Sequence, residues 1–243
     1  MEGSGIEREL MRSYAMDTTL ASRRLEAAVT ASSGIRDAGR LLQVMGHLIG
    51  DGRVSGASVR GNGNDAQVAV GVLAQIAADL LEASASLLSG TNHYAGAALV
   101  RQVVEVEYLS WAFAHEKREA AEWLNSTHED RLKLFTPAKL RKVSDGRFPS
   151  SDYRHHCEQG GHPVPRAIPL VGNPDSAMAQ MLLVDLLLHS WRTTDNLIAW
   201  HSLNPAHRQA VGALKFAQRT FSNWGEGDPL YEWSITAPAA PPP

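Results

Sequence analysis

The sequence has little cysteine, little net charge and no long apolar run, and each shortage excludes a class of protein. Cys157 is the only cysteine among 243 residues, which excludes an internal disulfide and a zinc site that needs several thiolates. The formal net charge of −3 is too small to indicate nucleic-acid binding by itself. The longest apolar stretch, residues 181–188, is interrupted by Asp185, so we expect no membrane-spanning segment. Because the acidic N-terminus also lacks an apolar stretch, we predict a cytoplasmic protein.

What the sequence does contain is helical periodicity. Apolar residues recur with a helical period in several segments, which predicts helices over residues 6–31, 35–49, 65–89, 91–117, 118–134, 177–203 and 206–223, and short helices over 137–143 and 151–158. Six prolines between 136 and 176 exclude a long helix there. No strand pattern and no repeat is evident. The predicted fold is therefore all-α, an antiparallel helical bundle with an irregular, proline-rich segment over about 136–176.

The spacing of glycine and proline predicts the domain organisation. Residues 65–234 form the main helical domain, in which Asp65 caps a helix that Gly90 ends. Residues 51–64 are rich in glycine and form a linker. Residues 1–50 pack either on the bundle or on a partner chain, which leaves a homodimer open. The proline-rich tail, residues 235–243, is expected to be disordered.

Polar residues interrupt the apolar helix predicted over 177–203. Asp185, His189, Arg192 and Asn196 lie at offsets that place them on one face. Three interpretations are open: a solvated face, pairing among these residues alone, or a buried polar network.

The helix predicted over 91–117 has a similar feature. Arg101, Glu105 and Tyr108 share a face, and Arg101 and Glu105 have the spacing of an ion pair. Apolar residues on nearly all sides of this helix indicate a central position, where a buried pair needs further partners.

The segment YRHHCEQGGHPVPRA, residues 153–167, can supply such partners. Tyr153, His156 and Cys157 share a face of the short helix predicted there, and Gly160–Gly161 ends it before His162. We predict a buried polar cluster that joins the three segments. Its members are Arg101, Glu105, Tyr153, His156, His162, Asp185, His189 and Arg192. The candidate catalytic residues are Arg101, Glu105, Tyr153 and His162, and the candidate binding residues are Arg154, His156, Cys157, Asp185, His189 and Arg192.

Familiar catalytic and metal motifs are missing around these residues. Histidine and cysteine are metal-binding residue types, but the sequence has no HExxH, no paired Glu-x-x-His and no Cys-x-x-Cys. We therefore expect no metal and no cofactor. Cys157 beside two histidines offers a nucleophile and a base, but the local signatures of catalytic cysteines are absent.

Two motifs carry a resemblance to a known family. Ala97 to Glu105 fit A-x-L-x-R-x-x-x-E, and Tyr153 to His162 fit Tyr-x-x-x-(Ser/Cys)-x-x-x-x-His. Over residues 65–205 the chain resembles an uncharacterised bacterial all-α family of unknown function. That family, with members among actinobacterial hypothetical proteins, is loosely similar to HEPN and abortive-infection V-type proteins. The resemblance implies that Arg101, Glu105, Tyr153, Cys157 and His162 are its shared polar positions, and it transfers no established activity. RNA or a nucleotide stays open as a partner.

HEPN ribonucleases place four to six residues between an arginine and a histidine. Arg40 and His47 have this spacing, as chance alone would produce, whereas Arg154 and His162 miss it by one residue. Two functions follow as predictions. The first is an interaction or regulatory protein in which the cluster is structural. The second is a HEPN-like, metal-independent ribonuclease or another phosphate-handling enzyme in phage defence. In the second, Arg101 or Arg154 holds the phosphate and His162 is the acid or base.

Overall fold

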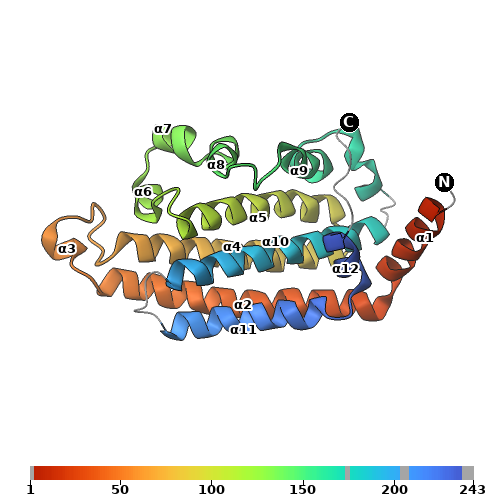
Figure 1. Ribbon diagram of the computed structural model, residues 1–243, viewed down its shortest axis with the longest axis horizontal. Coiled ribbons are helices and arrows are strands. Elements are labelled where there is room, and N and C mark those ends of the chain that lie inside the picture. The colour runs from red at the N-terminus through yellow and green to blue at the C-terminus, as the bar shows by residue number, and fades with distance from the viewer. Residues whose placement is uncertain (1–2, 173–175, 203–207, 237–243) are drawn as a thin grey trace.

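A computed structural model describes residues 3–172, 176–202 and 208–236, and all regular structure in these ranges is helical (Figure 1). The prediction of an all-α fold is confirmed. The long helices are α2 (Thr18–Leu48), α4 (Asp65–Ser89), α5 (His93–Ala114), α10 (Ser176–Ser202) and α11 (Arg208–Gly225). They run side by side, and α1 (Gly3–Met16) slants away at one end (Figure 1). Helix α2 packs along α4 and α11, and α5 packs along α4 and α10. Residues 18–48 therefore lie within the bundle, one of the two positions expected for the N-terminal helices.

Glycine allows α2 and α4 to approach until their backbones touch. A Cβ atom on Gly71 would lie 2.6 Å from the backbone nitrogen of Gln43 and 2.7 Å from the carbonyl oxygen of Gly39. Neither atom can move away, because both belong to the α2 backbone. Fully buried alanines such as Ala38 and Ala74 also lie on these two helices. Small residues let the two helix backbones come close, and their direct van der Waals contact stabilises the interface.

The N-terminal helix boundaries differ from those predicted. Helices were expected over 6–31 and 35–49, but the break lies at Asp17, whose carboxylate accepts hydrogen bonds from the first backbone amides of α2. Helix α2 then continues through Gly34. A Cβ atom there would lie 2.9 Å from the carbonyl oxygen of Ala213 on α11. Gly34 therefore permits a helix contact and does not end a helix.

Residues 51–64, expected to be a linker, are anchored to the start of α4. They contain the short α3 (Gly52–Ser55). The carboxylate of Asp65 accepts hydrogen bonds from Ser58 and Asn62 at 2.6 Å and from Asn125 at 2.7 Å. Burial raises the pKa of Asp65, but these three hydrogen bonds lower it below its ordinary value. Asn64, and not Asp65 as predicted, caps α4 by accepting from the Gln67 amide.

A layer of short helices covers one side of α5 (Figure 1). It consists of α6 (Ala120–Asn125), α7 (His128–Asp130), α8 (Pro137–Val143) and α9 (Ser150–His156). Two π-helical turns, Arg131–Phe135 and Cys157–Gly161, and a 3₁₀ helix, Pro165–Leu170, lie between or after them. The helix predicted over 118–134 is broken at Ser126, which ends α6. The proline-rich segment over about 136–176, expected to be irregular, is partly helical. Its 3₁₀ helix begins at Pro165, and proline suits a first helical turn.

A buried ion pair fixes α12 (Pro229–Thr236), a helix that the sequence analysis missed. The Arg24 guanidinium donates to both carboxylate oxygens of Asp228, at 2.7 and 2.9 Å. Asp228 also accepts from the Trp224 indole at 2.9 Å and from the Leu230 amide at 3.0 Å. Residues 235 and 236, expected to be disordered, are the last residues of α12, and the remainder of the predicted tail, 237–243, lies outside the described residues.

Helix α4 is long and apolar enough to cross a membrane by length and composition, with a mean hydropathy of 1.5 over its best window. The sequence analysis expected no such segment. Within the bundle, 61% of that window is buried against other helices, and core helices of soluble proteins have the same composition.

Candidate functional site

A small second core positions α9 against α5. It contains Val104, Tyr108, Trp111, Ala112, Leu140 and Phe148. The rings of Tyr108 and Phe148 have centroids 4.1 Å apart. Beyond α9, Gly160 lies directly on the α5 backbone, where a Cβ atom would be 2.5 Å from the Ala98 nitrogen. These contacts place both faces of α9 close to polar side chains of the long helices.

The predicted polar cluster divides into two groups. In the first, Arg101 donates to the Tyr153 hydroxyl at 2.9 Å, and that hydroxyl donates to Glu105 at 2.8 Å. Arg101 and Glu105 also form an ion pair at 2.8 Å, with side chains 29% and 32% exposed. The expectation of a fully buried pair is therefore wrong, because the layer of short helices covers this side of α5 only in part.

Two predicted members belong to neither group. The side chain of His162 is exposed, and the backbone amide of His162 bonds to the carbonyl of Cys157. Arg192 is exposed, although Asn196 on the same predicted face is buried and donates to the Ser110 hydroxyl at 3.2 Å. The polar face of α10 thus straddles the protein surface, so it is neither wholly solvated nor wholly buried. The remaining predicted residues, Arg154 and Cys157, line a hollow together with Tyr153.

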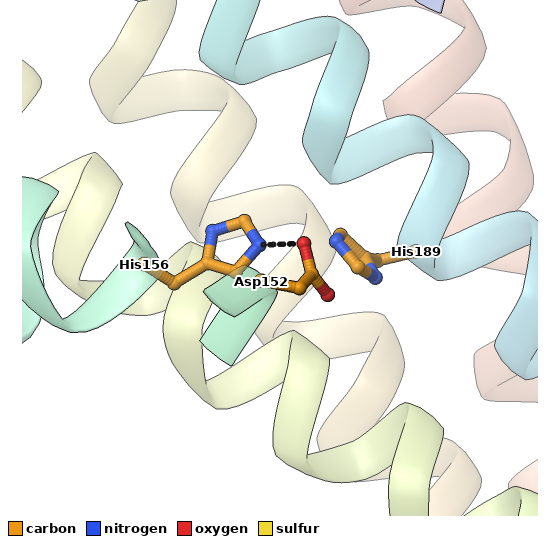
Figure 2. A group of neighbouring side chains, drawn as sticks. All are labelled: Asp152, His156 and His189. Atoms are coloured by element: carbon orange, nitrogen blue, oxygen red, sulfur yellow. Dashed lines mark ion pairs between the residues drawn. The ribbon is translucent and has the colours of Figure 1, made fainter. Parts of the chain in front are cut away.

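The second group joins His156 of α9 to Asp185 and His189 of α10, together with Asp152 and Glu107, which the sequence analysis did not select. His156 Nε2 lies 3.6 Å from Asp152 Oδ1, and His156 Nδ1 lies 3.4 Å from Asp185 Oδ2. His189 Nε2 lies 3.4 Å from Asp185 Oδ1. Figure 2 shows the Asp152 carboxylate between the two imidazole rings. We refer to these five residues as the Asp–His cluster.

Glu107 holds His189 from behind. His189 Nδ1 and Glu107 Oε2 are 2.5 Å apart, and both side chains are 3% exposed. Burial alone would lower the pKa of His189, but the carboxylates of Asp185 and Glu107 raise it to about 10. Burial likewise would raise the pKa of Asp185, but His189 and His156 lower it far below its ordinary value. In the protein by itself, His189 is therefore a cation between two carboxylates.

His156 and Tyr108 are among the buried groups in this region that have no hydrogen-bond partner. His156 is 2% exposed, yet neither ring nitrogen makes a hydrogen bond within the described part of the chain. The Tyr108 hydroxyl is also buried without a partner. Burial raises the pKa of Tyr108, and the charges of Asp152 and Glu107 raise it further, so the hydroxyl keeps its proton. Because buried polar groups are normally satisfied, both point to a ligand or a water molecule.

A sequence signal for part of this cluster exists. Asp152 and His156 have the same spacing of four residues as Asp185 and His189, and that spacing places each pair on one helix face. Glu107 had no comparable signal. It is two residues from Glu105, and this step turns a helix by about 200°, so the two carboxylates project from opposite sides of α5.

The cluster offers the atoms of a metal site. One ligand atom each from Asp152, His156 and His189 can be chosen so that all three lie within 4.8 Å of one another. The histidines are buried, whereas the side chains of Asp152 and Asp185 are 40% and 33% exposed, so the cluster is open to solvent on its carboxylate side.

Comparison with known proteins adds no relative to this picture. No protein-family model, no curated protein and no solved structure matches the chain. The resemblance to an uncharacterised, loosely HEPN-like family therefore stays a prediction.

Proposed function

We propose that the protein binds one divalent transition-metal ion between α9 and α10, through Asp152, His156 and His189. The observation that carries this proposal is the state of His156, a buried imidazole at ion-pair distance from a carboxylate on each side and without a hydrogen bond to either. A metal ion would satisfy that ring. This proposal replaces the expectation from sequence motifs that no metal is bound.

The spacing of the donor atoms supports coordination. Nitrogen and oxygen atoms 3.4–3.6 Å apart are too far apart for a good hydrogen bond. Two ligands that each lie about 2.1 Å from a tetrahedral ion are about 3.4 Å from one another. Of the proposed ligands, His156 Nε2 and Asp152 Oδ1 stand close to the separation that a shared ion requires, at 3.6 Å, and a ligand atom of His189 lies within 4.8 Å of a ligand atom of each.

Glu107 plays the part of an outer-shell residue. Histidine ligands in metal sites usually donate their second ring N–H to a carboxylate, which fixes the ring and its tautomer. Glu107 accepts from His189 Nδ1 in this way, which leaves Nε2 directed at Asp185. A metal ion bound at Nε2 would displace the proton that this atom carries in the cation.

Charge and ligand type favour a divalent ion. Three carboxylates, Glu107, Asp152 and Asp185, surround one cationic imidazole, so the cluster carries excess negative charge that a cation would neutralise. Nitrogen and oxygen ligands without a thiolate suit Zn²⁺, Mn²⁺, Fe²⁺ or Co²⁺. Three protein ligands with an open, wet side are typical of catalytic rather than structural sites.

The competing proposal is that the cluster is structural in an interaction or regulatory protein. The ion pair of His189 with Glu107 favours it, because this pair connects α5 and α10 without any metal. The two proposals differ in one respect that can be measured, which is stoichiometric metal binding.

The test titrates the purified, chelator-treated protein with Co²⁺ and then with Zn²⁺. We expect one equivalent of Co²⁺ to produce visible absorption bands, and Zn²⁺ to displace them. His156→Ala should abolish this signal. The matched control is His155→Ala, since His155 is the exposed neighbour on the same helix and is not a proposed ligand.

Circular dichroism of each variant checks that the helices remain folded. Failure of the wild-type protein to bind one equivalent of either ion would overturn the proposal. So would an equal loss of binding in the His155 and His156 variants.

A further inference from the structure

A hollow on the other side of α9 is lined by Pro149 and six polar side chains. It has a volume of about 680 Å³, and its polar lining consists of Arg141, Ser150, Ser151, Tyr153, Arg154 and Cys157. No carboxylate is among the side chains that line it. Tyr153 directly follows Asp152, and Cys157 directly follows His156. Asp152 and His156 belong to the Asp–His cluster, whereas Tyr153 and Cys157 line the hollow, so this short helical segment separates the two sites.

Arg141 has an unfilled hydrogen-bonding capacity in this hollow. Its guanidinium lies 4.7 Å from the centre of the Tyr153 ring, and its Nη1 atom is buried without a hydrogen-bond partner. A buried cationic donor normally has an acceptor. Arg154 is exposed on the same wall, and neither arginine forms an ion pair with a carboxylate of the described residues. Two arginines therefore face a space that contains no protein anion.

The Tyr153 side chain, which lines the hollow, is held in place by two hydrogen bonds. Its hydroxyl accepts from Arg101 and donates to Glu105, so both hydrogen-bonding roles of that oxygen are used outside the hollow. Burial raises the pKa of Tyr153, Arg101 lowers it and Glu105 raises it, with a net value of about 12. The phenol is therefore neutral, so it adds no negative charge that would repel an anion bound in the hollow.

The surrounding segment is strongly basic although the whole chain is acidic. Residues 131–147 contain six basic side chains and one acidic side chain, whereas the chain has a net charge of −3. Five of the six basic residues, all except Arg141, are exposed. Arg141 of this segment lines the hollow, and the excess of positive charge along the segment favours the approach of anions.

We propose that this hollow binds the phosphate group of a small phosphomonoester, a role separate from the proposed metal centre. Paired guanidinium groups match the geometry of phosphate oxygens, and the hydroxyls of Ser150 and Ser151 add neutral donors. The volume lies in the range of about 300–1,000 Å³ that is typical of organic-ligand sites, so it accommodates more than a free phosphate ion. Phosphate is favoured over a carboxylate because it offers three acceptor oxygens to the two arginines and two serines that line the hollow.

The experiment measures binding calorimetrically in the presence of a chelator, so that the result does not depend on a metal. The probes are inorganic phosphate, phenyl phosphate and phenol. We expect phenyl phosphate to bind and phenol not to bind. If inorganic phosphate binds more weakly than phenyl phosphate, the ligand is an ester. If the two bind equally, the ligand is the free anion, held by the same donors.

Arg154→Gln should weaken binding about tenfold, the loss expected for one charge-assisted hydrogen bond. Arg147→Gln removes the same charge from an exposed position that does not line the hollow, and it should leave affinity nearly unchanged. His156→Ala should also retain phosphate binding, which separates this proposal from the metal proposal. Absence of phosphate and phenyl phosphate binding at millimolar concentration, or equal losses in the two arginine variants, would overturn it.

Discussion

The buried pair of Arg24 and Asp228 gives the largest stability effect that we expect from a single substitution. Both side chains are shielded from water, at 0% and 2% exposure. Asp228→Ala would leave the guanidinium buried without its carboxylate, and it would remove the acceptor of the Trp224 indole.

The structure sets the size of the effect. Breaking a buried ion pair by removing one partner costs about 3–5 kcal/mol, and an unsatisfied buried donor costs about 1–3 kcal/mol. Because Arg24 and Trp224 share one acceptor, the two costs overlap, and we expect a total of about 4 kcal/mol. For a chain of this size that loss lowers the Tm by about 8–16 °C.

Urea unfolding followed by circular dichroism measures the change. The control is Glu158→Ala, which breaks the exposed pair of Glu158 and Arg166 and should cost less than about 1 kcal/mol. The double variant Arg24→Met with Asp228→Ala should be more stable than Asp228→Ala alone, because no unpaired charge remains. The reasoning from burial is refuted if Asp228→Ala costs less than about 1 kcal/mol. It is also refuted if the double variant loses as much stability as Arg24→Met and Asp228→Ala lose in total when each is made alone.

Three further predictions concern the proposed site and the elements around it. Glu107→Gln should weaken Co²⁺ binding about 10–100-fold through loss of the outer-shell carboxylate, and unchanged affinity in the Co²⁺ titration would contradict its positioning role. Gly160→Ala should destabilise the protein by about 1–3 kcal/mol, because its methyl group meets the α5 backbone at Ala98. The control is Gly212→Ala, whose methyl group has nothing within 4 Å and should not destabilise the protein. Equal Tm values for the two variants would contradict the contact. The pKa of Asp65 is lower in the folded than in the unfolded chain, so its carboxylate stabilises the fold above its unfolded pKa, and this contribution is lost as the pH falls. The stability difference between wild type and Asp65→Asn should therefore shrink below about pH 4, and a constant difference over roughly pH 3 to 7 in urea unfolding would show that the hydrogen bonds do not favour the ionised form.

Local pattern predicted the long helices well. The helix expected over 177–203 is α10, Ser176–Ser202. Its apolar residues recur with a helical period, and the prolines before and after them limit where the helix can begin and end. The failures occurred where tertiary contact decides the outcome. Gly34 reads as a break in sequence, but it allows two helices to touch. Asp228 reads as a loop residue, and its partner lies 204 positions away.

The candidate site shows the same division. Helical spacing correctly grouped Asp185 with His189 and Arg101 with Glu105, since residues four apart share a helix face. Spacing cannot show which face meets which neighbour. His162 was therefore assigned to a buried cluster although it is exposed, and Glu107 was overlooked because the importance of its carboxylate depends on α10 lying against that side of α5.

The backbone contact between Gly39 and Gly71 has a consequence for how the molecule could respond to a ligand. Sliding α2 along α4 by even one residue would drive a side chain into a peptide group, so the register of these two helices is fixed. Helix α9 has no such lock on its solvent side and is only seven residues long. We expect ligand-induced adjustment to be confined to the covering layer of short helices, while the five long helices act as an immobile frame.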